Sequence, residues 1–201
     1  MKILAGTLIT EALAVKLLRR RETLGPFAGL NEMRVALTNL SGMPEGDWTD
    51  FGRGSNAVRR LMLSGALAAW DYGAELPPDT GVIGWNGCGC TAENLRFWHD
   101  YVQNGRENGR GGLFVATLPT IPFCEAAIAF GWKGPSAYFR TEESTLALFR
   151  LIAGRPAGKY VIGEITEKTA CALLFETDET IPEFPDFKSF EQLFPFLEGL
   201  A

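Results

Sequence analysis

The stretch from residue 131 to residue 163 constrains the fold more than any other part of the sequence. A Gly-Pro pair is followed at 136–140 by a short run with two aromatic residues, which is typical of a strand. Thr141 stands where a helix cap is expected and acidic residues follow it, so residues 144–153 are predicted to be a helix. Arg150 alone interrupts the apolar surface of that helix. We therefore expect the helix to be covered nearly all round.

Strand patterns and helix patterns alternate along the rest of the chain. Strands are predicted at 3–9, 81–85, 136–140, 159–165 and 170–176. Helices are predicted at 10–21, 57–72, 91–103, 123–130 and 144–153. Residues 22–51 are rich in Gly, Pro, Asn and Asp and have no sustained period, so they are predicted to be irregular. The last two strands flank a four-residue turn, which indicates an antiparallel hairpin. The sequence therefore predicts an α/β fold with a mostly parallel sheet and one antiparallel strand.

Composition and charge narrow the class of protein. The chain has 201 residues, of which 46% are hydrophobic and 21% charged, as is usual for one globular domain. Its net charge of −5 provides no basic face for a phosphate backbone, so nucleic-acid binding is not expected. No apolar run approaches the ~20 residues of a membrane span, and a cytoplasmic location is predicted. The four cysteines are expected to be reduced thiols.

The Gly134–Pro135 pair, the strand at 136–140 and the helix behind it resemble one family of enzymes, the β-ketoacyl synthases, which are condensing enzymes of the thiolase fold. In that family the strand leads to a nucleophilic cysteine at the first turn of a buried helix. Counting from Pro135, the position of that cysteine is held here by Glu143. The likeness extends to five further segments, which are 2–10, 79–87, 118–131, 159–165 and 170–176.

This resemblance implies a thiolase-like half-domain at 1–178, with a five-stranded mixed sheet flanked by helices and one antiparallel strand. The family normally repeats this unit, and the second unit supplies two catalytic histidines. Here residues 179–201 form an aromatic-rich tail with five phenylalanines. A covered aromatic ring buries roughly 150–250 Å². We expect the tail to pack on the domain or on a partner, over a face that a second half would otherwise cover.

The resemblance makes Glu143 the candidate catalytic residue. A carboxylate at a helix N-terminus is a well-placed anion, but it cannot carry a thioester-linked acyl group as a cysteine does. Thr141, Phe139, Gly87 and Gly89 are the candidate substrate-binding residues around it. The alternative is that the acids only stabilise the first helical turn, by about 0.3–1 kcal/mol each. The glycines would then only permit a tight turn between strand and helix.

Other catalytic patterns are weak. His99 is the only histidine and lies in a helix pattern, so it is expected at a solvated position. Cys88 and Cys90 are separated by one residue, whereas structural zinc sites usually have two residues between paired cysteines and two further ligands. Neither a metal nor a cofactor is expected. The sequence also lacks the G-x-S-x-G pattern of serine hydrolases and a phosphate-binding loop.

The resemblance implies a β-ketoacyl-synthase-like protein of fatty-acid or polyketide-type biosynthesis that lacks condensing activity by itself. Its expected role is that of a chain-length-factor-like subunit that binds an acyl carrier protein or a complete β-ketoacyl synthase. In family dimers the strand before the nucleophile lies at the two-fold interface, so 136–140 is the candidate edge for a homodimer or heterodimer. The alternative is an acyl-thioester enzyme, a malonyl decarboxylase or acyltransferase, that uses Glu143 in a site completed by a partner chain.

Overall fold

The computed structural model describes residues 1–85, 90–105, 107, 110–140, 144–177, 180–181 and 183–200. The strands are β1 (Lys2–Ile9), β2 (Val15–Leu17), β3 (Thr23–Leu24), β4 (Gly81–Trp85), β5 (Ser136–Phe139), β6 (Gly158–Ile165) and β7 (Ala170–Thr177). The helices are α1 (Leu30–Thr38), η1 (Thr49–Gly52), α2 (Asn56–Tyr72), α3 (Thr91–Asn104), α4 (Gly111–Val115), α5 (Ile121–Ala129), α6 (Thr145–Ala153) and α7 (Phe190–Leu200). The mixed α/β class predicted from the sequence is confirmed.

The strands form one sheet in the order β3-β2-β1-β7-β6-β4-β5. The pairs β4–β5 and β4–β6 are parallel, whereas β7 is antiparallel to both of its neighbours, β1 and β6. It follows that β1, β4, β5 and β6 point the same way and that β7 alone among these five runs in the opposite direction. The short strands β2 and β3 extend the sheet beyond β1 by antiparallel pairing, so the sheet has seven strands rather than the expected five.

Residues 10–21 do not form the predicted helix. They make a turn, in which the Thr10 hydroxyl accepts a hydrogen bond from the backbone N–H of Ala14 at 3.2 Å, and then the strand β2. Leu13 and Arg21 both have a positive φ, of 54° and 55°, which ends any helical path. The prediction was wrong because the leucine spacing of a short hairpin imitated the period of a helix.

A buried carboxylate explains why this hairpin is preferred over a helix. Asp71, near the end of α2, accepts backbone hydrogen bonds from Gly6, Arg19 and Arg20 at 2.9–3.0 Å. Hydrogen bonds to a charged group contribute roughly 1.5–3 kcal/mol each, which exceeds the small differences in helix propensity. The tertiary contact therefore decides the local conformation.

Residues 22–51 contain more regular structure than their composition predicts. They include β3, helix α1 and the start of the short helix η1. Met33 and Leu37 of α1 and Phe51 of η1 are buried in the same cluster as the apolar side of α2. The prediction of an irregular segment was wrong in part, because its many Gly, Pro, Asn and Asp residues and the lack of a sustained period concealed these short elements.

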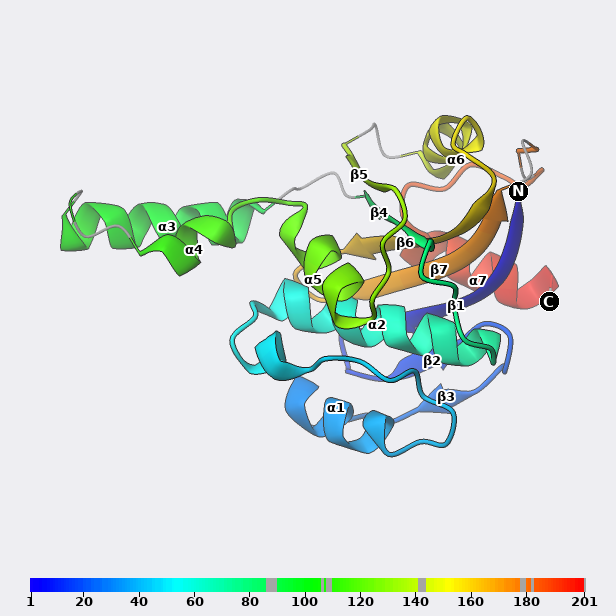
Figure 1. Cartoon of the computed structure of the whole chain (residues 1–201), viewed down its shortest axis with the longest axis horizontal. Helices are drawn as coiled ribbons and strands as arrows, with labels where there is room; N and C mark the ends of the chain where they lie inside the picture. Colours follow the sequence, from blue (N-terminus) through cyan, green and yellow to red (C-terminus); the bar gives the residue numbers. More distant parts are fainter. Residues whose placement is uncertain are drawn as a thin grey trace.

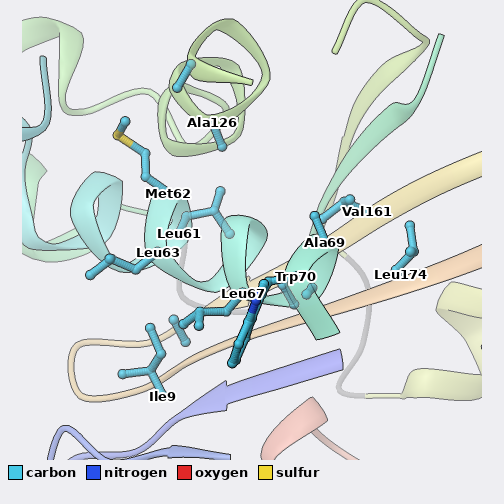
Figure 2. Packing of buried hydrophobic residues seen from close by; sticks show 14 of the residues in the cluster. Ile9, Leu61, Met62, Leu63, Leu67, Ala69, Trp70, Ala126, Val161 and Leu174 are labelled. Carbon is cyan, nitrogen blue, oxygen red and sulfur yellow. The ribbon is translucent and has the colours of Figure 1, made fainter. Parts of the chain in front are cut away.

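Helix α2 covers the first face of the sheet together with α5 (Figure 1). Its start is as predicted, because the Ser55 hydroxyl accepts a hydrogen bond from the N–H of Val58 at 3.3 Å, and it ends at Gly73 with a left-handed φ of 78°. Figure 2 shows side chains of α2 lying among Ile9, Val161 and other residues of the strands. Each fully buried large aliphatic side chain contributes about 1.5–3 kcal/mol.

Two glycines side by side in the sheet make room for α5. Gly84 of β4 and Gly163 of β6 are register partners. A Cβ atom at Gly84 would lie 2.5 Å from the ring of Phe123, and one at Gly163 would lie 2.4 Å from a methyl group of Leu61. The missing side chains therefore allow the Phe123 ring and α2 to approach the sheet closely.

The second face of the sheet is covered by α6, α7 and the segment before α7. Its buried cluster consists of Met1, Leu8, Leu18, Ile83, Trp85, Leu148, Phe149, Ile152, Tyr160, Ile162, Cys171, Leu173, Phe175, Phe190, Leu193, Phe194 and Leu197. Phe184, Phe187 and Phe196 of the tail pack against this cluster. Both faces of the sheet are thus buried, which explains why the strands have nearly continuous apolar runs.

Helix α6 differs from its prediction in two respects. Its cap is Ser144, whose hydroxyl accepts a hydrogen bond from the N–H of Ala147 at 3.0 Å, whereas Thr141 lies outside the described residues. The helix is also not covered all round, because Arg150 is exposed and Leu151 is 48% exposed. Only one face of α6 meets the sheet and the tail, so its other face remains open to solvent.

We expect Gly134→Ala to destabilise the protein. Gly134 donates a backbone hydrogen bond to Thr80, and a Cβ atom there would lie 2.0 Å from the carbonyl oxygen of Asp79. Because the backbone around Asp79 would have to move, the free energy of unfolding should fall by about 3 kcal/mol. This is the upper end of the usual cost of inserting an extra methyl group into a well-packed core. Urea denaturation measures this. The matched control is Gly154→Ala, where no atom lies within 4 Å; equal effects of the two changes would contradict the prediction.

Candidate functional site

A cavity of about 710 Å³ lies where the parallel strands β5 and β6 end. In open α/β sheets, ligands bind outside the carboxyl ends of the strands. The lining residues are Asn56, Ala57, Cys90, Thr91, Ala92, Glu93, Pro119, Pro122, Phe123, Arg140, Ile165, Thr166, Glu167 and Lys168. They come from the starts of α2 and α3, the start of α5 and the segment before it, the residue that follows β5, and the end of β6 with the β6–β7 turn. The cavity is therefore the candidate functional site.

The cavity has an apolar wall and a charged rim. Pro119, Pro122 and Phe123 form part of the wall, and Phe123 is held in place by the paired glycines of the sheet. On the rim, the ammonium group of Lys168 lies 2.7 Å from the carboxylate of Glu11. This ion pair raises the pKa of Lys168, mainly through the hydrogen bond. Such a cavity suits an extended apolar chain that has a polar end.

Cys90 is the cysteine among the cavity residues, and its environment disfavours a nucleophilic role. Its side chain is buried at the start of α3. Burial, and then the nearby Glu93 carboxylate, raise the pKa of the Cys90 thiol to about 11. Because the thiolate is the nucleophilic form, Cys90 is protonated and unreactive near neutral pH.

Among the described residues, the other thiols are buried or stand apart from potential metal ligands. Cys171 is buried in β7, and its pKa is raised well above the usual value, mainly by desolvation and then by Glu164. Within the described part of the chain, Cys90, Cys124 and Cys171 are free cysteines, and no group of three potential metal ligands is present.

Of the predicted catalytic and substrate-binding residues, Phe139 alone is among the residues that the structure describes. Glu143, Thr141, Gly87 and Gly89, like Cys88, lie outside the described residues. Phe139 ends β5, where it packs against the cluster of the second face and carries the guanidinium of Arg155 at 5.3 Å from its ring. The next residue, Arg140, lines the cavity instead. His99 is exposed on α3 and is not part of the cavity lining.

Strand β5 is the last strand of the sheet on the side of the cavity. It is partly exposed along its whole length, from Ser136 to Phe139. The sequence predicted this segment as an edge, and the observed strand order places it there.

Helices α3 and α4 form an arm that projects away from the sheet beyond the cavity (Figure 1). The rings of Phe97 and Phe114, with centroids 5.6 Å apart, and the Asp100–Arg110 ion pair at 3.5 Å hold the two helices together. No described residue of α3 or α4 is buried. The arm therefore has almost no packing against the rest of the chain.

Large apolar side chains are exposed on this arm. Leu95, Trp98 and Val102 of α3 are 56–61% exposed, and Phe114 of α4 is 53% exposed. The three side chains of α3 are spaced i, i+3 and i+7, which aligns them as one stripe. An exposed apolar stripe of this kind is typical of surfaces that other molecules cover. The sequence predicted the helix, and the stripe was readable in it, but its exposure depends on where the arm lies.

No protein-family model matches the sequence, and neither does any curated protein. The fold, however, is similar to the thiolase-like fold found in a solved ketosynthase complex. One similar solved structure is a chain of "Ketosynthase (ApeO) in Complex with its Chain Length Factor (ApeC) from Xenorhabdus doucetiae". The TM-score is 0.58 and the sequence identity 14%, over 99% of this chain and 90% of the other. The predicted likeness in fold is confirmed; the replacement of a cysteine by Glu143 stays a prediction.

None of the helices described is both long enough and apolar enough to cross a bilayer.

We expect Cys90 to react slowly with iodoacetamide. A pKa of about 11 instead of 9.0 leaves about 100-fold less thiolate near neutral pH, since each pKa unit is a factor of ten. Peptide mass spectrometry as a function of pH measures the rate at this residue. Glu93→Gln should increase the rate only slightly, because burial is the larger cause. Alkylation of Cys90 as fast as that of free glutathione at pH 8 would contradict this assignment.

Proposed function

We propose that this protein is a ketosynthase-like subunit of fatty-acid or polyketide-type biosynthesis that does not condense acyl groups itself. It would bind a complete β-ketoacyl synthase and act as a chain-length-factor-like partner. The observation that carries this proposal is the cavity at the strand ends, whose cysteine is protonated, next to an arm with an uncovered apolar stripe.

The chemistry of the chain supports a role without independent condensation. A single histidine cannot supply the two catalytic histidines that the resemblance implies. That histidine, His99, is exposed on the arm and not among the cavity residues. A complete set of catalytic groups would therefore have to come from a partner chain.

Two surfaces near the cavity support a partner of the same fold. The edge strand β5 offers backbone groups for pairing with an edge strand of another sheet. The arm begins at the cavity rim, because Thr91 and Glu93 of α3 line the cavity. A partner that pairs with β5 and covers Leu95, Trp98 and Val102 would also close the cavity mouth.

The cavity itself supports an acyl ligand that a carrier protein delivers. Its wall of Pro119, Pro122 and Phe123 suits an acyl chain. Arg140 on the rim offers a cation to the phosphate of a carrier-bound arm. In this proposal the chain limits the space for the growing acyl product while the partner performs the reaction.

The test is co-expression with a β-ketoacyl synthase from the same source, followed by size-exclusion chromatography with light scattering. We expect a stable complex of the two chains. Leu95→Glu with Trp98→Glu should weaken the complex at least 10-fold, because each charge would be placed in a desolvated contact. The matched control is Val35→Glu on α1, where the side chain is 53% exposed, and it should have no effect.

Two results would contradict the proposal. One is a chain that remains separate from the synthase at high concentration. The other is release of CO₂ from a malonyl-carrier protein by this chain alone, lost in Glu143→Ala, which would favour the decarboxylase alternative.

A further inference from the structure

The N-terminus of α6 is held by a carboxylate from the tail. Asp186 accepts a backbone hydrogen bond from Leu146 at 2.9 Å and hydrogen bonds from the Ser144 hydroxyl at 2.8 and 3.0 Å. It also accepts one from the Thr145 hydroxyl at 3.3 Å. The Ser144 oxygen in turn accepts a hydrogen bond from the N–H of Ala147. The hydroxyl of Ser144 therefore donates to the carboxylate and accepts from the backbone, as a hydroxyl can.

Backbone contacts make this arrangement rigid. The N–H of Thr145 donates to the carbonyl oxygen of Phe187 at 2.8 Å, and the N–H of Phe187 donates to the hydroxyl of Thr145 at 3.1 Å. Thr145 is fully buried. A few residues later, the buried Glu164 carboxylate accepts the N–H of Phe190, at the start of α7, at 2.5 Å. The segment 186–190 is thus fixed to the domain at both of its ends.

A helix N-terminus carries a partial positive charge of roughly half an elementary charge, through N–H groups without partners in the helix. That charge is what favours a thiolate or an oxyanion at such a position. In α6 the N–H of Leu146 already donates to Asp186, and the N–H of Ala147 donates to Ser144. The full negative charge of the carboxylate exceeds the partial positive charge of the helix end.

We infer that the exposed carboxylate of Asp186 is an intramolecular anion that occupies the N-terminus of α6 and disfavours a thiolate or an oxyanion at that helix end. This inference deepens the proposed non-condensing function and names a second reason for it, separate from residue 143. A nucleophile in place of the Ser144 hydroxyl would face this carboxylate about 3 Å away instead of an unoccupied helix end. The tail therefore covers the second face and also removes the electrostatic basis for acyl transfer.

The first test places a reporter thiol at the cap by Ser144→Cys in the full chain. Alkylation of the peptide that contains residue 144, followed by mass spectrometry from pH 5 to pH 11, gives its pKa. We expect a value at or above about 8.5, the ordinary value of a cysteine, although helix N-termini lower it to about 3.5–7.5. A pKa below 7.5 with Asp186 intact would overturn the inference.

The second variant adds Asp186→Asn, which keeps a carbonyl oxygen for Leu146 but removes the charge. The pKa of the reporter thiol should fall by at least about one unit, because a like charge within hydrogen-bond distance has been removed. Glu183→Gln, an exposed change in the same tail, is the matched control and should leave the pKa unchanged. Equal pKa values with aspartate and asparagine at 186 would also overturn the inference.

A third measurement needs no variant and does not depend on how the variants fold. The hydrogen bond from Leu146 chiefly lowers the pKa of Asp186, so a carboxyl-detected NMR titration of the wild-type chain should place it below about 3.9. An Asp186 carboxyl with an ordinary or raised pKa would overturn the inference. These titrations use no synthase, so they are independent of whether the complex in the proposed function forms.

Discussion

Burial of both faces of the sheet is the constraint on which the rest of the structure depends. β6 and β7 are buried along most of their length and have apolar side chains on each face, so neither face can be left in water. Helix α2 covers one face, with α5 fitted over Gly84 and Gly163. The other face needs an equally large cover, and the tail provides it with phenylalanines from segments around 184–196. The hydrogen bonds of Asp186 and Glu164 then fix where this cover lies.

Elements with strong local signals were predictable from the sequence. The cap at Ser55, the wide apolar face of α2 and the hairpin of β6 and β7 are specified by neighbouring residues, and the structure has each of them. Residues 10–21 were not predictable in this way, because their conformation is decided by Asp71, which lies about fifty residues later in the chain. The exposed face of α6 was missed for a related reason: an apolar helix pattern tells how much surface could be covered, but not which element covers it.

Prediction of the candidate site from the sequence is limited in the same way. The Gly134–Pro135 pair correctly marked the start of β5, where the close approach of the backbone at Asp79 requires the glycine. The cavity wall could not be predicted, since it joins the start of α2, the segment before α5 and the β6–β7 turn, which are far apart in the sequence. Asp186 was missed as well, because it lies 42 residues from Ser144 and the tail offers several acids with no sequence signal to distinguish them.

The chain buries its apolar surface on the second face of the sheet but not on the arm at the carboxyl ends of the strands. This difference is the physical argument for a partner. On the second face the tail buries the apolar surface and supplies the carboxylate at the N-terminus of α6, so that face needs no further chain for its core. At the carboxyl ends of the strands the arm instead leaves Leu95, Trp98 and Val102 in solvent beside a large cavity. Isolated helices of about 12–15 residues are only marginally stable in water, so α3 gains most from a surface that another chain provides. In the proposed complex this stripe is the surface that the partner would cover.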